Sequence, residues 1–148
     1  MLYTQSIDCA TFYRQFDRIL HEIKSERFDL IVAVARGGVI PAGLLQQELG
    51  LPLRVIAVSY RDEKNAPLYE DAKILEDGPF PVKGKTILLV DDVSRTGRTI
   101  ARAREYLAGN TIKTFLLNGK TDGGAAAIKP DYELFHTDEC LRMPWKRD

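Results

Sequence analysis

The sequence KTILLVDDVSRTGRTI, residues Lys85–Ile100, places an apolar run, an acidic pair and a glycine-containing loop in immediate succession. Thr86–Val90 is rich in β-branched residues, which predicts a strand buried on both faces of a parallel sheet. Asp91 and Asp92 follow at its carboxyl end. Because an unpaired buried charge is costly, we expect both carboxylates to face a cleft, where hydroxyl groups or a metal ion can use them.

The loop after the acidic pair, SRTGRT, supplies hydroxyl groups, one glycine and two arginines just before a helical pattern that begins near Ile100. Backbone N–H groups at a helix N-terminus bind phosphate, and Ser and Thr hydroxyls complete such a site. We therefore predict that an anion is bound by Ser94, Arg95, Thr96, Gly97, Arg98 and Thr99.

Two other interpretations fit part of this pattern. An acidic pair after an apolar strand also occurs in the receiver domains of response regulators, and a Thr-Gly pair can be a plain strand-to-helix turn. The acidic pair of a receiver lies near the start of the chain, whereas here it lies at residue 91, and no later strand ends in a suitable Asp. This position argues against the receiver.

The composition limits the class of protein. A chain of 148 residues with 45% hydrophobic and 28% charged residues predicts a single domain, residues 1–148. The formal net charge is zero, which gives no reason to expect nucleic acid or a membrane surface as a partner. Two isolated cysteines and the absence of a leader pattern predict a soluble, cytoplasmic protein.

The rest of the chain alternates between helical and strand patterns. Helices are predicted over about 8–27, 40–49 and 100–107, and strands over Asp29–Ala35, Leu53–Tyr60, Thr86–Val90, Thr111–Leu117 and Tyr132–Thr137. This alternation predicts an α/β fold with a doubly wound, mostly parallel sheet flanked by helices. Ligand-binding loops are expected at the carboxyl ends of the strands.

Two connections carry further information. Arg36, Gly37 and Gly38 lie between a strand and a helix; they fit a second anion-binding loop, although a plain βα turn would also use two glycines. With VDDVSRTGRT in the same chain we favour the anion loop. Residues 61–83 are charged and contain three prolines, which favours a mobile flap, with a β-hairpin as the alternative.

These segments resemble those of a known family. VDDVSRTGRT is similar to the phosphoribosyl-pyrophosphate (PRPP) signature of type I phosphoribosyltransferases, and AVARGGVIPAGLLQQELG is similar to the segment that carries their pyrophosphate loop. The resemblance is closest to the bacterial xanthine-guanine phosphoribosyltransferases. It implies that the 5-phosphate binds at 94–99, the ribose at Asp91 and Asp92, and the pyrophosphate at Arg36-Gly37-Gly38, with Mg²⁺ near the acidic pair.

The resemblance also assigns roles outside these loops. Ser59 and Tyr60 match a Ser-Tyr pair that opens a flexible catalytic loop, and the last residues match a small hood segment over the nucleobase. Lys120 matches the lysine that addresses the 6-oxo group of a purine, and Leu141 matches the residue whose backbone meets the ring. Cys140 stands where the family has an aromatic residue that stacks on the purine.

Arg95 departs from the purine members, which usually carry an Asp at this position to take or share the N7 proton. A guanidinium cannot act as a base. Two hypotheses follow: a Mg²⁺-dependent transferase that joins PRPP to a nucleobase, foremost a 6-oxopurine such as xanthine, guanine or hypoxanthine, or a non-catalytic PRPP or nucleotide sensor on the same fold. The family resemblance further implies a homo-oligomer, a dimer or a tetramer.

Overall fold

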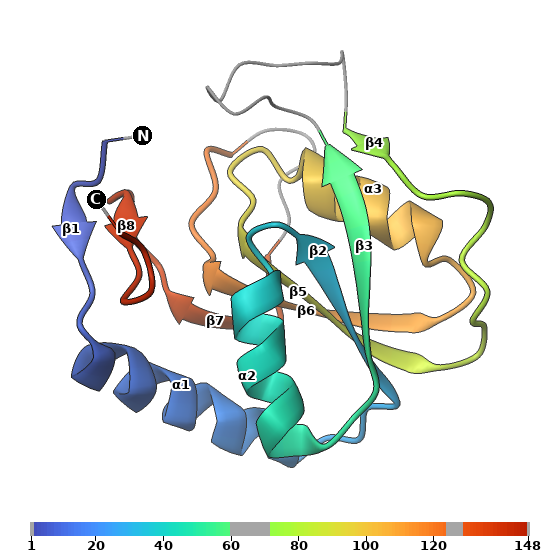
Figure 1. Cartoon of the computed structure of the whole chain (residues 1–148), viewed down its shortest axis with the longest axis horizontal. Coiled ribbons are helices and arrows are strands. Elements are labelled where there is room, and N and C mark those ends of the chain that lie inside the picture. The colour runs from blue at the N-terminus through green and yellow to red at the C-terminus, as the bar shows by residue number, and fades with distance from the viewer. Residues whose placement is uncertain (1, 60–71, 124–128, 148) are drawn as a thin grey trace.

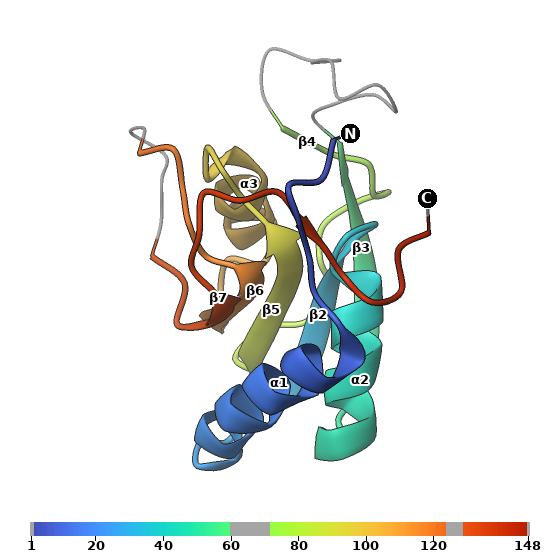
Figure 2. The ribbon, with the colours of Figure 1, turned by 90° about the vertical axis from the view of Figure 1, so that its left-hand side faces the viewer.

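The structure is a computed structural model that describes residues 2–59, 72–123 and 129–147. In this part of the chain, a six-stranded sheet lies between helices, with α1 and α2 on one face and α3 on the other (Figures 1 and 2). The elements are β1 (Gln5–Ser6), α1 (Cys9–Lys24), β2 (Leu30–Ala35), α2 (Val39–Leu49), β3 (Leu53–Ser59), β4 (Lys73–Ile74), β5 (Thr86–Val93), α3 (Arg98–Tyr106), β6 (Thr111–Asn118), β7 (Tyr132–Phe135) and β8 (Leu141–Arg142).

The strands are ordered β4-β3-β2-β5-β6-β7, and all neighbouring pairs are parallel except β3 with β4. The chain passes from β3 back across β2 to β5, so strand order reverses between β2 and β5 as in other doubly wound sheets. The predicted fold class is therefore confirmed. The carboxyl ends of β2 and β5, where ligand loops were expected, are adjacent.

The core has one layer on each face of the sheet. Phe12, Phe16, Ile19, Leu20 and Ile23 of α1 pack with alternate residues of β2, β5 and β6, whereas Ile100 and Ala103 of α3 pack with the other alternate set. Residues 87–90 of β5 are each 0% exposed, as predicted for a strand covered on both faces. Burial of this strand holds its carboxyl end in a fixed position.

Several predicted boundaries were wrong by a few residues. Strand β5 continues through the acidic pair, because Asp91 and Val93 extend the backbone ladder to Leu116 and Asn118 of β6. Helix α3 begins at Arg98, two residues before the predicted start. Helix α1 ends at Lys24 instead of Arg27, because the backbone N–H and the hydroxyl of Ser25 both bond to the Glu22 carbonyl and close the last turn.

The second half of the predicted flap packs onto the protein. Strand β4 pairs antiparallel with the end of β3, and Glu76 Oε1 accepts a hydrogen bond of 2.6 Å from the Ala57 N–H. Phe80 is 4% exposed and stacks edge-on against Tyr106. Residues 72–83 thus pair and pack against the sheet and α3, and the antiparallel pairing of β3 with β4 agrees with the β-hairpin alternative. Residues 60–71 of the predicted flap lie outside the described part.

The two ends of the chain meet in a short ribbon that the sequence patterns did not predict. Strand β1 pairs in parallel with β8, and the Thr4 N–H donates to the carbonyl of Cys140 at 2.9 Å. Figure 2 shows this C-terminal part crossing near the carboxyl ends of the central strands. No helix within the described residues has the length and apolarity to cross a membrane.

Candidate functional site

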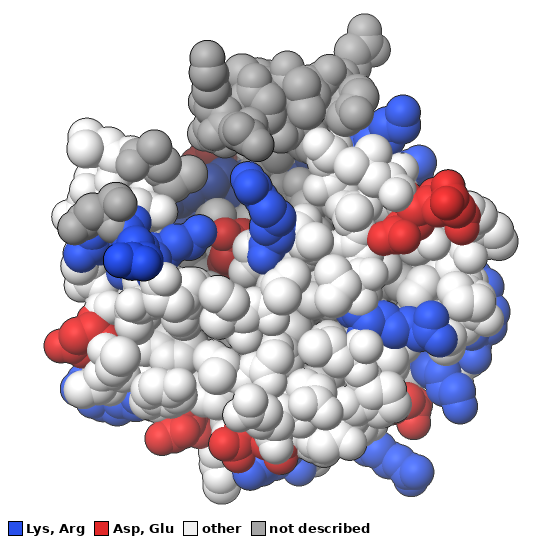
Figure 3. Space-filling view, viewed as in Figure 1, with Lys and Arg blue, Asp and Glu red and all other residues white. Residues whose placement is uncertain are grey.

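The predicted PRPP-binding residues converge at the carboxyl ends of β2 and β5. Arg36-Gly37-Gly38 follows β2 directly, and Asp91 and Asp92 lie at the end of β5, its parallel neighbour. In the space-filling view, acidic surface lies within a depression that is flanked by Lys and Arg surface (Figure 3). The fold thus brings together two loops that are more than fifty residues apart in sequence.

The two glycines are required by close approach to β5. A Cβ atom on Gly37 would lie 2.3 Å from Cγ of Asp92, and one on Gly38 would lie 2.2 Å from the carbonyl oxygen of Val90. Neither glycine has a positive φ, so lack of space explains them, not backbone conformation. The peptide bond before Arg36 is cis. The short distance from Gly37 to Asp92 shows that the backbone of this loop lies directly against the Asp92 carboxylate.

The two carboxylates have different environments. Asp91 is 5% exposed, so the expectation that both side chains face a cleft was wrong for Asp91, whereas Asp92 is partly exposed. Burial, and next the charge of Asp92, raise the pKa of Asp91 well above its ordinary value, while the Asp92 N–H that donates to Asp91 Oδ1 opposes this shift. The Val93 N–H donates to Asp92 Oδ1 at 2.7 Å. Asp92 is thus the carboxylate that a ligand can reach.

Residues 94–99, named here the phosphate loop, form the turn before α3. Gly97 has φ 79°, a left-handed conformation suited to glycine, and is the N-cap residue of the nine-residue helix α3. Within the described part of the chain, the N–H groups of Thr96, Gly97 and Thr99 have no protein acceptor. The buried Ser94 hydroxyl also lacks a partner there. These unpaired donors meet the requirements of an anion site.

Arg95 lies in the phosphate loop, but its side chain contacts another segment. Its Nη2 donates to the backbone carbonyls of Glu139 at 3.2 Å and Asp138 at 3.5 Å. Its own carbonyl accepts a hydrogen bond of 2.8 Å from the Asp122 N–H. Arg95 therefore connects three separate stretches of the chain.

The residues predicted for the nucleobase half lie around residues 138–141, named here the C-terminal segment. Lys120 follows β6, and its Nζ lies 4.0 Å from Asp138 Oδ1. Cys140 donates its N–H to the Thr4 hydroxyl at 2.8 Å, and Leu141 begins β8 and packs partly buried against the core. Of the predicted loop pair, Ser59 is the last residue of β3, and Tyr60 lies outside the described residues.

Two supporting residues were not singled out from the sequence. Asn118 is 5% exposed; its Oδ1 accepts from the N–H groups of Lys120 and Thr137, and its Nδ2 donates to the Thr137 carbonyl. Thr4 bonds to both backbone groups of Cys140. A polar residue at the end of a buried apolar strand was an available signal for Asn118, whereas the residues before α1 show no pattern that marks Thr4.

The carboxylate oxygens at the end of β5 fit a magnesium ion that is bound jointly by the protein and a phosphate-containing substrate. Mg²⁺ is usually bound by one or two carboxylates, with substrate oxygens and water completing its octahedron. Asp92 offers a partly exposed carboxylate beside the Gly37 backbone. The described residues contain no cluster of three or more His, Cys, Asp or Glu side chains that would hold a metal ion without a substrate.

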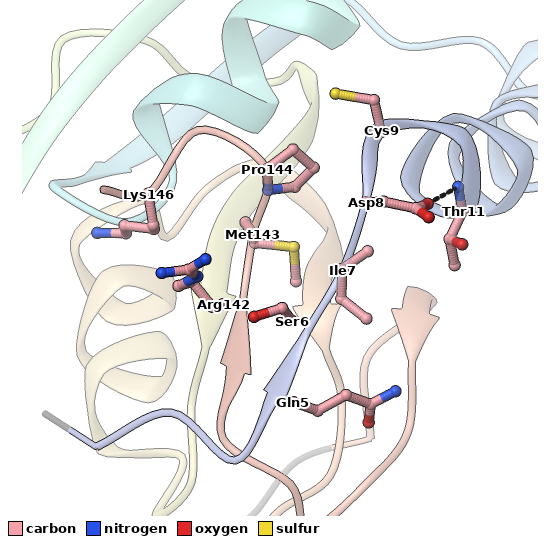
Figure 4. A pocket seen from close by; sticks show the side chains of 10 residues that line it. All are labelled: Gln5, Ser6, Ile7, Asp8, Cys9, Thr11, Arg142, Met143, Pro144 and Lys146. Carbon is pink, nitrogen blue, oxygen red and sulfur yellow. Dashed lines mark hydrogen bonds between the residues drawn. The ribbon is translucent and has the colours of Figure 1, made fainter. Parts of the chain in front are cut away.

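A cavity of about 480 Å³ lies apart from these loops (Figure 4). It is lined by Gln5, Ser6, Ile7, Asp8, Cys9, Thr11, Arg142, Met143, Pro144 and Lys146. None of these residues was predicted to bind PRPP or a nucleobase. At the N-terminus of α1 beside it, Asp8 accepts a hydrogen bond from the Thr11 N–H, so a carboxylate of the protein already occupies the cap.

Comparison with known proteins agrees with this geometry. The phosphoribosyl transferase domain family model matches residues 8–146, so the chain belongs to the phosphoribosyltransferase family. The purine phosphoribosyltransferase of Pyrococcus horikoshii has a similar structure, with 30% sequence identity, a TM-score of 0.76, and coverage of 97% of this chain and 94% of that chain.

Curated relatives act on different bases. The chain is 33% identical to the orotate phosphoribosyltransferase of Sulfurisphaera tokodaii over 110 residues, which are 72% of this chain and 52% of that protein. It is 32% identical to the xanthine-guanine phosphoribosyltransferase of Idiomarina loihiensis over 87 residues, which are 58% of this chain and 53% of that protein. The match thus spans about half the length of each of these two relatives.

Proposed function

We propose that this protein transfers the 5-phosphoribosyl group of PRPP to a 6-oxopurine, namely xanthine, guanine or hypoxanthine, and releases pyrophosphate. The observation that carries the proposal is the contact between Gly37 and Asp92, because it joins a loop suited to pyrophosphate to a carboxylate suited to a ribose or a metal ion. The unpaired amides of the phosphate loop provide a separate site for the 5-phosphate. The purine phosphoribosyltransferase of similar structure supports the choice of a purine.

In this proposal the 5-phosphate, the ribose and the pyrophosphate of PRPP each bind to a different set of groups. The N–H groups of Thr96, Gly97 and Thr99 bind the 5-phosphate, and the Ser94 hydroxyl completes that shell. Asp92, the accessible carboxylate of the pair, binds the ribose hydroxyls. Arg36 and the Gly37 amide bind the pyrophosphate, since the Gly38 N–H already donates to the Val34 carbonyl. A Mg²⁺ ion bound at Asp92 would neutralise charge on the pyrophosphate as it leaves.

The transfer itself needs no covalent intermediate on the protein. The bond from the anomeric carbon to pyrophosphate breaks, and its electron pair leaves with the pyrophosphate. A ring nitrogen of the base supplies the pair that forms the new bond, and its proton is then lost. Asp92 stabilises the positive charge that develops on the sugar between these events. Because a guanidinium offers no proton acceptor, the proton passes to water or to a pyrophosphate oxygen and not to Arg95.

Three further roles complete the proposal. Lys120 addresses the 6-oxo group of the base, and Cys140 and Leu141 line its ring. Ser59 and Tyr60 begin a loop that covers PRPP and keeps water from the reactive sugar. We also propose a single cytoplasmic domain that forms a homo-oligomer, a dimer or a tetramer, with neither nucleic acid nor a membrane as a partner.

One observation favours a second candidate, a non-catalytic PRPP or nucleotide sensor. The base-proximal position of the phosphate loop holds Arg95, whose guanidinium bonds to the protein backbone instead of offering a proton acceptor. A sensor needs only the PRPP-binding half of the site. General-base assistance is typically worth about a hundredfold to ten-thousandfold in rate, so its loss matters for an enzyme and not for a sensor.

Release of pyrophosphate in the presence of PRPP and Mg²⁺ distinguishes the candidates. A panel of xanthine, guanine, hypoxanthine, adenine, orotate and uracil should give base-dependent release with one or more 6-oxopurines. Asp92→Asn serves as the matched inactive control. Tight PRPP binding with no release for any base would favour the sensor. Absence of binding to both PRPP and purine nucleotides would contradict both candidates.

A further inference from the structure

We propose that Arg95 is a positioning residue that couples the phosphate loop to the C-terminal segment, so that an anion bound at the loop also orders the nucleobase side of the site. This inference rests on the proposed function, because it assigns the two sides to the 5-phosphate and to the base. It gives the side chain a role different from phosphate binding.

The contacts of Arg95 support a coupling role. Its guanidinium donates to two successive carbonyls, those of Asp138 and Glu139. Its backbone carbonyl accepts from the N–H of Asp122, in the connection between β6 and β7. The Asp122 N–H therefore holds the backbone of Arg95 in place, while the Arg95 side chain contacts a segment more than forty residues later in the sequence.

The other contacts of the C-terminal segment leave its first half dependent on Arg95. Cys140 is fixed by Thr4, and Leu141 by the pairing of β8 with β1. At Asp138 and Glu139, the described contacts besides Arg95 are the 4.0 Å approach of Lys120 and a local bond from the Glu139 N–H to Thr137 Oγ1. Both residues are exposed, so little packing holds them in place.

A guanidinium suits this role for physical reasons. It is planar, permanently charged, and presents several donors in a fixed arrangement, so one side chain can hold two carbonyls at once. An anion on the amides of residues 96–99 fixes the loop from which Arg95 projects. Ordering of the loop lowers the entropic cost of holding the C-terminal segment, and by linkage a base under that segment strengthens anion binding equally.

Hydrogen exchange of the C-terminal segment tests the coupling without relying on turnover. In the free protein, Arg95→Ala should speed exchange of the Glu139 amide by about tenfold, the effect of losing one charge-assisted contact, whereas the Cys140 amide, which Thr4 holds, should change little. Saturating ribose 5-phosphate should slow that exchange in the wild type and leave it unchanged in Arg95→Ala. Arg95→Lys keeps the charge without the planar guanidinium, so its exchange rate should lie between those of the wild type and Arg95→Ala.

Arg104→Ala is the matched control, because Arg104 is exposed in the last turn of α3 and lies outside the proposed site. It should exchange like the wild type. Exchange in Arg95→Ala within twofold of the wild type, or equal slowing of both by ribose 5-phosphate, would overturn the inference. A wild type that binds no PRPP by calorimetry would instead contradict the proposed function, and the free-protein comparison would still decide whether Arg95 holds the segment.

Discussion

The backbone of Gly37 lies against the carboxylate of Asp92, so closely that a Cβ atom at residue 37 would lie 2.3 Å from Asp92 Cγ. This contact joins the loop after β2 to the end of β5. A carboxylate of the kind that Mg²⁺ prefers and the glycine loop after β2 therefore lie side by side, as we propose for a PRPP site.

Gly37→Ala should weaken PRPP binding in the presence of Mg²⁺ by about tenfold or more, because the methyl group must displace the Asp92 side chain and one charge-assisted contact is lost. Calorimetric titration measures this effect. Folding should be nearly unaffected, since Asp92 is partly exposed and can move. Undiminished PRPP affinity in Gly37→Ala would show that the Asp92 carboxylate is not used.

Gly43→Ala is the control for that experiment. Gly43 lies within α2, and a Cβ atom there would meet nothing within 4 Å. Alanine is the better helix former, so we expect a gain of about 0.5–1 kcal/mol in the free energy of unfolding and unchanged PRPP affinity. A loss of stability, measured by urea denaturation, would mean that α2 lacks the described space.

The two carboxylates should differ when each is changed to Asn. Asp92→Asn removes the charge that a ligand can reach, and PRPP affinity should fall by roughly 1.5–3 kcal/mol. Asp91→Asn should have a smaller effect, because Asp91 is 5% exposed. Calorimetry with and without Mg²⁺ separates the two variants; an equal or larger loss for Asp91→Asn would reverse the assigned roles.

Asn118→Ala should destabilise the protein by about 1–3 kcal/mol, because it leaves partly buried backbone groups of Thr137 and Lys120 without partners. Asn118→Asp keeps the acceptor Oδ1 but replaces the Nδ2 donor with a carboxylate oxygen that faces the Thr137 carbonyl at a buried position, so it should also destabilise the protein. Urea denaturation gives both values. Wild-type stability in Asn118→Ala would show that these bonds contribute nothing.

A cluster remote from the site predicts a pH dependence of stability. Hydrogen bonds from Lys113 and then Tyr132 hold the pKa of Glu26 below its ordinary value of 4.5. Since the folded-state pKa is depressed, this contribution is present above about pH 4.5 and is lost as the pH falls through the folded-state value. Glu26→Gln should therefore be less stable than the wild type at pH 7, and the difference should shrink as the solution is acidified.

That comparison needs a partner variant. Lys113→Met removes the leading cause of the Glu26 pKa shift, so in this background the stability difference made by Glu26→Gln should depend less on pH. Denaturation curves recorded between pH 7 and pH 3 measure the free energy of unfolding of each variant. A gap between wild type and Glu26→Gln that stays constant over this range would exclude the depressed pKa.

Features encoded by local patterns were predictable from the sequence. Buried β-branched runs marked the central strands, and Gly50 marked the end of α2, where it has φ 66°. The acidic pair and the two glycine-containing loops were predicted at the carboxyl ends of strands, and the sheet order places two of these ends, those of β2 and β5, side by side.

The remaining features depend on contacts between distant segments. Two-residue strands such as β1 and β8 carry no periodicity. Strand β5 extends through the acidic pair because Asp91 and Val93 pair with β6. Phe80 lies between two prolines in a charged stretch without a clear period, so its burial could not be predicted. For Arg95, the sequence could exclude a general base, but its partners at Asp138 and Glu139 are set by the tertiary fold.

A crystal structure with a purine nucleoside monophosphate tests the central claim most directly. The 5-phosphate should lie within hydrogen-bonding distance of the N–H groups of Thr96, Gly97 and Thr99, the ribose hydroxyls should lie at Asp92, and the base should lie beneath residues 138–141. A nucleotide whose phosphate lies elsewhere, with the amides of the phosphate loop unused, would contradict the account.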